Sequence, residues 1–251
     1  LQHGLNSLEA LQSGETSRLQ IGALPSVAAK LLPEAVLRFR ALSPGTLVVI
    51  EEGAHDTLVD RLRGGELDLV VGRLGAPESM TGLSFTQLYS EHVEVVTAAG
   101  HPLAGTDRLA EIARWPVLYP PRRAAIRPLV DRLCVAHGIG ELPDRIETVS
   151  EAFGRGMVLG PARAVWIISH GVVAADLAAG TLAALRMDRA LTAGPVGVMA
   201  RSEEVGPPVA RLFRKALIDT GSGLGGPGQG GGGEKGGLRE EAGVQGSRTA
   251  R

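Results

Sequence analysis

The chain has 251 residues, of which 44% are hydrophobic and only 3% aromatic, so aliphatic side chains must fill a core large enough for one large or two small domains. The 26 Lys and Arg residues balance the 27 Asp and Glu residues, and a net charge of -1 excludes a strongly basic nucleic-acid-binding surface. A single cysteine, Cys134, excludes an internal disulfide framework and fits a reducing compartment.

Residues 1–18 precede the first predicted strand. Leucines at helical spacing followed by Gly14 predict the last turns of a helix. A helix arriving from an upstream domain explains this pattern, and so does a frayed helix packed on the domain itself. The segment lacks the basic and apolar regions of a signal peptide, and the chain lacks an apolar run of about 18 residues. We therefore expect a cytoplasmic location.

Residues 19–40, LQIGALPSVAAKLLPEAVLRFR, predict a buried strand, a bend at Gly22 and a helix that begins at Pro25. Ser26 is the predicted N-cap, because its hydroxyl can accept from a free amide of the first turn. Pro33 should kink the helix, since it removes one backbone donor. A strand that leads directly into a helix N-terminus favours the binding of an anion there.

Residues 47–50 and 67–72 predict two more strands, separated by a helix that Asp56 caps and that runs through residue 62. This alternation with short connections implies right-handed crossovers and a parallel sheet. Residues 83–98 add two extended segments. A second unit follows, with strands predicted at 117–119, 146–148, 165–168, 182–185 and 196–200, and helices at 126–137, 150–159, 172–179 and 207–218.

Two further features concern single residues and the end of the chain. Cys134 lies on the apolar face of the helix at 126–137 and is predicted to be in the core. From Gly221 onward glycine dominates, and such a segment buries too little apolar surface to order itself. A G-x-G-x-x-G spacing within it has no strand before it and no helix after it, so we reject a dinucleotide site.

Three blocks of sequence carry a family resemblance. They are LQIGALPSVAAKLLPEAVLRFRALSPGTLVVIEEG, LVDRLRGGELDLVVGRL and LYSEHVEVVTAAGHPLA. In this order they resemble the effector-binding domain of LysR-type transcriptional regulators. The chain is similar to the subgroup that controls protocatechuate catabolism and a galactose-binding protein. The resemblance covers residues 1–219.

The resemblance implies an α/β fold of two Rossmann-like subdomains joined by two crossover strands, as in type 2 periplasmic binding proteins. Residues 1–18 would be the end of a linker helix, and 220–251 a disordered Gly-rich tail. Subdomain I would comprise 19–97 plus 201–219, and subdomain II would comprise 98–200.

The resemblance also implies a homodimer, with contacts at 58–62 and 172–177, and a tetramer of the full-length protein. Family members bind DNA through an N-terminal winged helix-turn-helix. We expect that domain to be missing here, so that this chain senses a ligand without binding DNA strongly by itself.

The resemblance further implies that a small organic anion, a carboxylate or a sugar acid, binds in the crevice between the subdomains. In subdomain I the candidates are Pro25 and Ser26 at the bend after the first strand, and Arg73 at the end of the third. A guanidinium pairs bidentately with a carboxylate. The alternatives are that Ser26 only caps its helix and that Arg73 bridges the subdomains or pairs with a nearby glutamate.

In subdomain II the resemblance points to three short segments. The candidate residues are Pro121, Arg122, Ser150, Phe153, Ser169 and His170. Two alternatives stay open here. Ser150 is as well explained as a helix cap, and His170 either senses protonation or has no special role.

The chemistry of most enzymes has no signature in this sequence. The six histidines form no pair with metal-ligand spacing, and neither G-x-S-x-G nor G-x-x-x-x-G-K-[ST] occurs. We therefore expect no metal, no cofactor and no enzymatic activity. Two alternatives remain: a solute-binding protein of a transporter for a small carboxylate or sugar, and an enzyme acting on a small acid in the same crevice.

Overall fold

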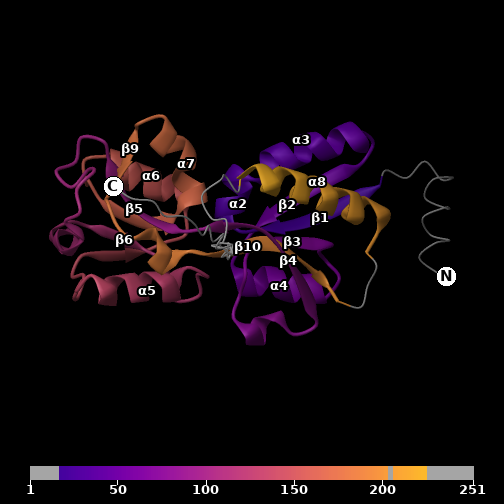
Figure 1. The fold of residues 1–251 in the computed structure, drawn as a ribbon, viewed down its shortest axis with the longest axis horizontal. Coiled ribbons are helices and arrows are strands. Elements are labelled where there is room, and N and C mark those ends of the chain that lie inside the picture. The colour runs from indigo at the N-terminus through magenta and orange to yellow at the C-terminus, as the bar shows by residue number, and fades with distance from the viewer. Residues whose placement is uncertain (1–16, 203–205, 225–251) are drawn as a thin grey trace, which may run out of the picture.

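The computed structural model describes residues 17–202 and 206–224. Their strands form two five-stranded sheets that lie end to end, each with helices on both faces (Figure 1). Residues 1–16 of the predicted linker-helix end and residues 225–251 of the predicted Gly-rich tail lie outside the described residues, whereas Arg18, predicted to be in the linker helix, is the first residue of a strand. In the described part, no helix is long and apolar enough to cross a membrane.

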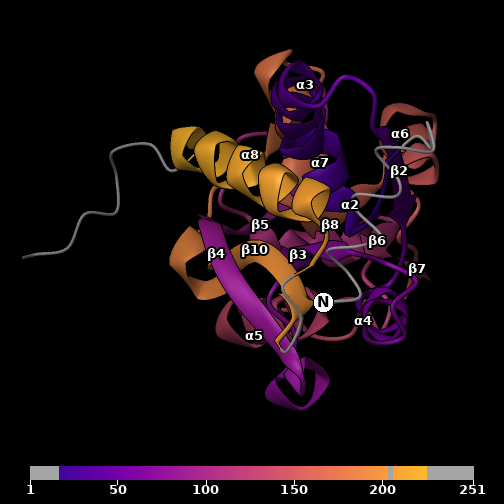
Figure 2. The ribbon, with the colours of Figure 1, turned by 90° about the vertical axis from the view of Figure 1, so that its right-hand side faces the viewer.

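The first sheet contains the N-terminal strands. In spatial order its strands are β2 (Leu47–Glu52), β1 (Arg18–Ala23), β3 (Leu69–Arg73), β10 (Gly194–Arg201) and β4 (Leu83–Glu91). β1 is parallel to β2 and β3, as predicted, whereas β10 is antiparallel to β3 and β4. One face carries α2 (Pro25–Lys30), α3 (Leu32–Leu42) and α8 (Pro208–Leu224), and the other carries α4 (His55–Arg63) (Figure 2).

The second sheet repeats this plan. In spatial order its strands are β7 (Arg145–Glu147), β6 (Val117–Tyr119), β8 (Val165–Ser169), β5 (Val93–Ala98) and β9 (Leu182–Ala184). One face carries α6 (Glu151–Leu159) and α7 (His170–Ala178), and the other carries α5 (Arg127–Ala136). Short 3₁₀ helices lie at η1 (Pro77–Met80), η2 (Leu109–Arg114) and η3 (Arg189–Thr192).

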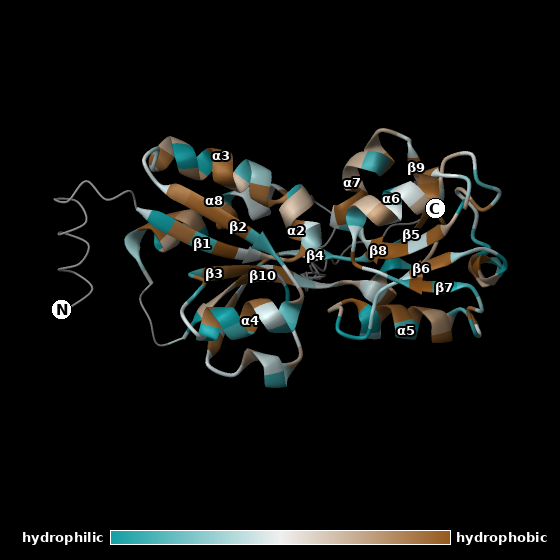
Figure 3. Cartoon of the chain, turned by 180° about the vertical axis from the view of Figure 1, so that it is seen from behind, coloured by the Kyte–Doolittle hydropathy of each residue, from teal (hydrophilic) through white to brown (hydrophobic). Residues whose placement is uncertain are grey.

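The second sheet has one apolar core, and the first sheet has one on the side of α3 and α8 and a smaller one on the side of α4. Hydrophobic residues accordingly run along strands of both sheets (Figure 3). Around the first sheet, Phe39 of α3 meets Phe213 of α8 edge to face, with ring centroids 5.3 Å apart. Around the second, Trp166 and Cys134 are buried among aliphatic side chains, which confirms Cys134 as a core residue. Apolar cores with few aromatic residues are the expected result of this composition.

The sheets divide the chain differently from the predicted subdomain boundaries. β5, placed in subdomain I, pairs with β8 and β9 of the second sheet, and β10, placed in subdomain II, pairs with β3 and β4 of the first. The chain thus crosses to the second sheet at His92 and returns between β9 and β10. An apolar run predicts a strand but not its pairing partner, which is set by contacts distant in sequence.

Several helix ends also differ from prediction. Leu24 and Ala54, not Ser26 and Asp56, are the N-caps of α2 and α4, and neither helix has a side-chain cap hydrogen bond. Instead of a single kinked helix, two helices meet at Leu31, with Pro33 in the first turn of the second. Proline is tolerated in a first turn because its missing donor has no partner there.

At the C-terminal end α8 continues to Leu224, five residues beyond the predicted limit of subdomain I at residue 219. Thr220 and Gly221 are buried against the first sheet. The Thr220 hydroxyl donates to the carbonyl of Ala216 one turn earlier. The glycine-rich composition therefore gave no indication of the last turn of α8, which contacts with the first sheet stabilise.

Candidate functional site

A cavity of about 620 Å³ lies between the two sheets. Its walls begin where parallel strands end: after β1, β2 and β3 on one side, and after β6, β7 and β8 on the other. Ligands of open α/β sheets bind at this edge, outside the carboxyl ends of the strands. The lining residues are 24–26, 52–55, Arg73, 120–126, 147–149, Ile168, Ser169 and Val172.

Arg73, the last residue of β3, is 4% exposed and lines the cavity. Its Nη1 donates to the backbone oxygen of Glu91 at 3.0 Å, and its Nη2 lies 3.7 Å from the Glu91 carboxylate. Nε and Nη2 have no hydrogen-bond partner. Burial lowers the pKa of Arg73, and the negative charge of Glu91 opposes this effect. Two donors of the buried guanidinium therefore make no hydrogen bond in this conformation.

The opposite wall contributes Arg122 and Arg123, which are both exposed. The cavity also has two carboxylates, Glu52 and Glu147, of which Glu147 already accepts from Arg127 at 3.2 Å. Burial, followed by repulsion from Glu151, raises the pKa of Glu52. The lining thus has three arginines and two glutamates, and the charge of Glu91 partly offsets that of Arg73, so Arg122 and Arg123 are the main positive groups that an anionic ligand would meet.

Three residues with hydroxyl groups, Ser26, Thr148 and Ser169, and one imidazole complete the polar lining. Ser26 and Ser169 are each 6% exposed, and neither side chain caps a helix. His55, the first residue of α4, is 4% exposed, and its buried Nε2 has no hydrogen-bond partner. Sequence reasoning missed His55, although its place directly after β2 marks the strand end at which it lies. α2, whose N-terminus was predicted to attract an anion, has only six residues and so a weak dipole.

Among the residues predicted from sequence, Pro25, Ser26, Arg73, Pro121, Arg122 and Ser169 line the cavity. The other three do not. The Ser150 hydroxyl caps α6 by accepting from the amide of Phe153 at 3.3 Å. The Phe153 side chain is 44% exposed, and His170 Nδ1 faces Glu94, 3.1 Å away.

The two sheets touch at the start of α7, beside the cavity. The Gly171 amide donates to the Glu91 carboxylate at 3.1 Å, across the point where the chain changes sheet. A Cβ at position 171 would lie 2.5 Å from the Ser26 carbonyl oxygen of α2, so only glycine allows this approach. Glu91 contacts both Arg73 and α7 and thus links the cavity wall to the second sheet.

Residues 12–222 match the model of the LysR substrate binding domain. The chain belongs to this family. It is 47% identical over 199 residues to the HTH-type transcriptional regulator PcaQ of Agrobacterium fabrum, which covers 78% of this chain and 63% of PcaQ. It is 30% identical over 208 residues to the HTH-type transcriptional regulator GalR of Pseudomonas putida, and this match covers 82% of this chain and 52% of GalR. The chain thus spans between half and two thirds of these relatives.

Solved structures confirm the predicted fold. The effector-binding domain of QuiR in complex with shikimate gives a TM-score of 0.68 at 18% identity, covering 84% of this chain and all of that one. Full-length CbnR complexed with its target DNA gives a TM-score of 0.65 at 17% sequence identity, and the match covers 87% of this chain and 76% of CbnR. The predicted family is likewise confirmed, and it consists of transcriptional regulators rather than enzymes. This LysR domain is therefore an effector-binding domain.

Proposed function

We propose that this domain senses a small organic anion, a carboxylate or a sugar acid, which binds in the cavity between the two sheets. Arg73 carries the proposal. A buried polar group without a hydrogen-bond partner costs free energy, and a charged group costs more. Nε and Nη2 of Arg73 are buried without hydrogen-bond partners at the wall of a cavity of about 620 Å³, and Nη2 has only the more distant Glu91 carboxylate at 3.7 Å. A rotation of the side chain towards the cavity would let an anion accept from both donors, and a cavity of this size suits a small molecule.

The other lining residues add contacts from both walls. The Ser26 hydroxyl lies on the side of the first sheet, and the Ser169 hydroxyl and Arg122 lie on the side of the second. A ligand that contacts both walls favours the conformation in which they are close together. It shifts that equilibrium by as much as its affinities for the two conformations differ. This is how the domain would report the effector to the rest of the regulator.

We further propose that the domain forms a homodimer and, in the full-length protein, a tetramer, with DNA bound only by a preceding winged helix-turn-helix. Leu58 and Leu62 of α4 and Val172 of α7 are at most 2% exposed within the chain itself. A dimer contact through these helices must therefore use their exposed faces rather than these apolar side chains.

The test is a thermal-shift screen of carboxylates and sugar acids, each compared with its neutral amide or parent sugar, followed by calorimetry of the best ligand. Arg73→Gln removes the charged donors, and Arg73→Lys keeps the charge without the bidentate geometry. A lost charged hydrogen bond is worth roughly 1.5–3 kcal/mol, so Arg73→Gln should raise Kd about 10- to 150-fold.

The matched control is Arg108→Gln, because Arg108 pairs with Glu111 on the surface outside the cavity. It should leave Kd unchanged. Circular dichroism confirms that each variant is folded. An acid that binds Arg73→Gln as tightly as the parent protein contradicts the proposed site, and a preference for the neutral analogues contradicts the proposed ligand class.

A further inference from the structure

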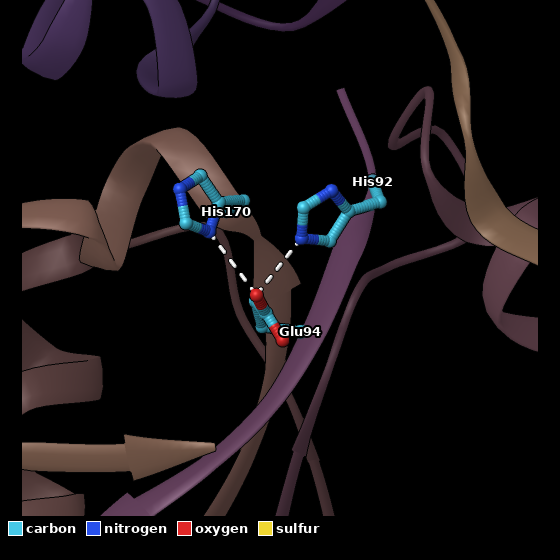
Figure 4. A group of neighbouring side chains, drawn as sticks. All are labelled: His92, Glu94 and His170. Carbon is cyan, nitrogen blue, oxygen red and sulfur yellow. Dashed lines mark hydrogen bonds and ion pairs between the residues drawn. The ribbon is translucent and has the colours of Figure 1, made fainter. Parts of the chain in front are cut away.

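A second polar cluster lies where the chain crosses between the sheets. His92 joins β4 to β5, Glu94 is the second residue of β5, and His170 is the first residue of α7 (Figure 4). Side chains two positions apart on an extended chain lie on the same side, which brings His92 next to Glu94. The His170 amide donates to the His92 carbonyl at 3.0 Å, which holds the third side chain beside the other two.

The three side chains converge on one point. Glu94 Oε1 is 2.8 Å from His92 Nε2 and 3.1 Å from His170 Nδ1, and these three atoms all lie within 4.8 Å of one another. Zinc bound tetrahedrally at about 2.0–2.1 Å holds its ligand atoms roughly 3.3–3.5 Å apart. The two imidazole nitrogens must approach each other by at most about 1.3 Å, and each must move a few tenths of an ångström away from Oε1, which rotation of the side chains allows.

Burial and charge also suit a cation. Glu94 is fully buried, whereas the side chains of His92 and His170 are 23% and 27% exposed, so an ion has access from the side of the imidazoles. Glu94 supplies the acidic group of the cluster, and its Oε2 is also buried and has no hydrogen-bond partner.

We propose that His92, Glu94 and His170 bind one divalent transition-metal ion of the zinc and cobalt class, with a fourth position open to water. Two imidazoles and a carboxylate are a common protein ligand set for zinc, whereas magnesium and calcium take oxygen ligands. Each neutral imidazole binds through the nitrogen that faces Glu94 and carries its proton on the other ring nitrogen. In the described part of the chain, no other group of three such side chains has suitable spacing.

Arg189 also contacts Glu94 and therefore allows an independent test of this site. Its Nη2 lies 3.0 Å from Glu94 Oε1, and its side chain is 56% exposed. A guanidinium and a metal ion on the same carboxylate repel each other, so metal binding turns Arg189 towards solvent. Arg189 lies in η3, just before the chain returns to the first sheet through β10. The ion would thus contact the segment at His92 that leads into the second sheet and displace Arg189 from the segment that leads back to the first. It would also contact the start of α7, next to the cavity-lining Ser169 and Val172.

The experiment titrates metal-stripped protein with zinc by calorimetry and with cobalt by visible absorption, where a d–d band reports coordination by protein. We expect one ion per chain. His92→Gln and His170→Gln each remove one ligand and should weaken binding by at least about tenfold, the lower end of the cost of losing even an outer-shell partner. Both side chains are partly exposed, so the variants should fold, which circular dichroism checks.

His137→Gln is the matched control, because His137 is a partly exposed histidine outside the cluster. It should bind zinc as the parent does. Arg189→Gln removes the competing cation and should bind zinc more tightly. Three results would each overturn the proposal. They are that the parent protein binds no zinc, that His92→Gln and His170→Gln bind zinc as tightly as the parent, and that Arg189→Gln binds it more weakly than the parent.

Discussion

Replacing Gly171 by alanine tests whether the contact between α2 and α7 holds the two sheets in their relative position. The added Cβ would lie 2.5 Å from the Ser26 carbonyl oxygen and 2.6 Å from the Glu91 carboxylate. The carboxylate is the end of a flexible side chain and can move. The carbonyl belongs to the backbone of α2 and cannot move without α2, so the two helices must separate.

The magnitude follows from three contributions. Overpacking of this kind costs roughly 1–3 kcal/mol. Displacing Glu91 also weakens its hydrogen bond with the Gly171 amide, whose complete loss would add roughly 1.5–3 kcal/mol. Alanine is a better helix former than glycine by up to about 1 kcal/mol, and less at the start of a helix. The free energy of unfolding should therefore fall by about 2 kcal/mol, which corresponds to a decrease in Tm of roughly 4–8 °C.

Urea denaturation followed by circular dichroism measures this change. Gly156→Ala is the matched control, because Gly156 is an exposed residue inside α6 and an added Cβ there meets nothing within 4 Å. That variant should be more stable than the parent by roughly 0.5–1 kcal/mol. A Gly171→Ala protein as stable as the parent would show that α2 and α7 move apart freely and that their contact does not fix the sheets.

The remaining predictions concern the cavity and its rim. Ser150→Ala removes the N-cap hydrogen bond of α6 and should lower the free energy of unfolding by about 1 kcal/mol in urea titrations. Ser26→Ala should leave stability nearly unchanged, because Ser26 caps no helix, while calorimetry should show weaker effector binding. The raised pKa of Glu52 means that its charged form disfavours folding. Glu52→Gln should therefore be more stable than the parent at pH 7, and the difference should vanish as the pH falls below about 4. An equal gain at low and neutral pH would contradict this explanation.

The order of strands and helices could be predicted from the sequence because it depends on local signals. Apolar runs such as 19–23 and 165–168 mark strands that are covered on both faces, and glycine and proline mark their ends. Sheet membership of β5 and β10 depends instead on pairing between distant segments, so the predicted boundaries at 97 and 200 were wrong. The N-cap of α2 also differs from the prediction. The backbone becomes helical directly after Leu24, so Leu24 is the N-cap although Ser26 has the better capping side chain.

The cavity was partly predictable, since parallel strands place their carboxyl ends at one edge and the residues that follow must line it. This rule located Arg73 and Ser169, and applied to β2 it also locates His55. The cluster around Glu94 was not predictable, because His92 and Glu94 are separated from His170 by most of the second sheet. A motif search finds metal ligands at fixed short spacing, whereas this group is assembled by the pairing of β5 with β8.

Several buried polar atoms without a hydrogen-bond partner lie close to the segments that join the two sheets, and this has a consequence for function. Arg73, Glu91 and Glu94 are each buried with at least one polar atom that lacks a hydrogen-bond partner. Such groups lower the stability of the conformation that contains them, so a ligand that satisfies them gains affinity for the conformation it completes. An anion at Arg73 and a cation at Glu94 would each act on a segment that joins the sheets. Because Glu91 bonds to α7 and contacts Arg73, we expect binding at either place to change the affinity at the other, and by linkage the two changes must be equal.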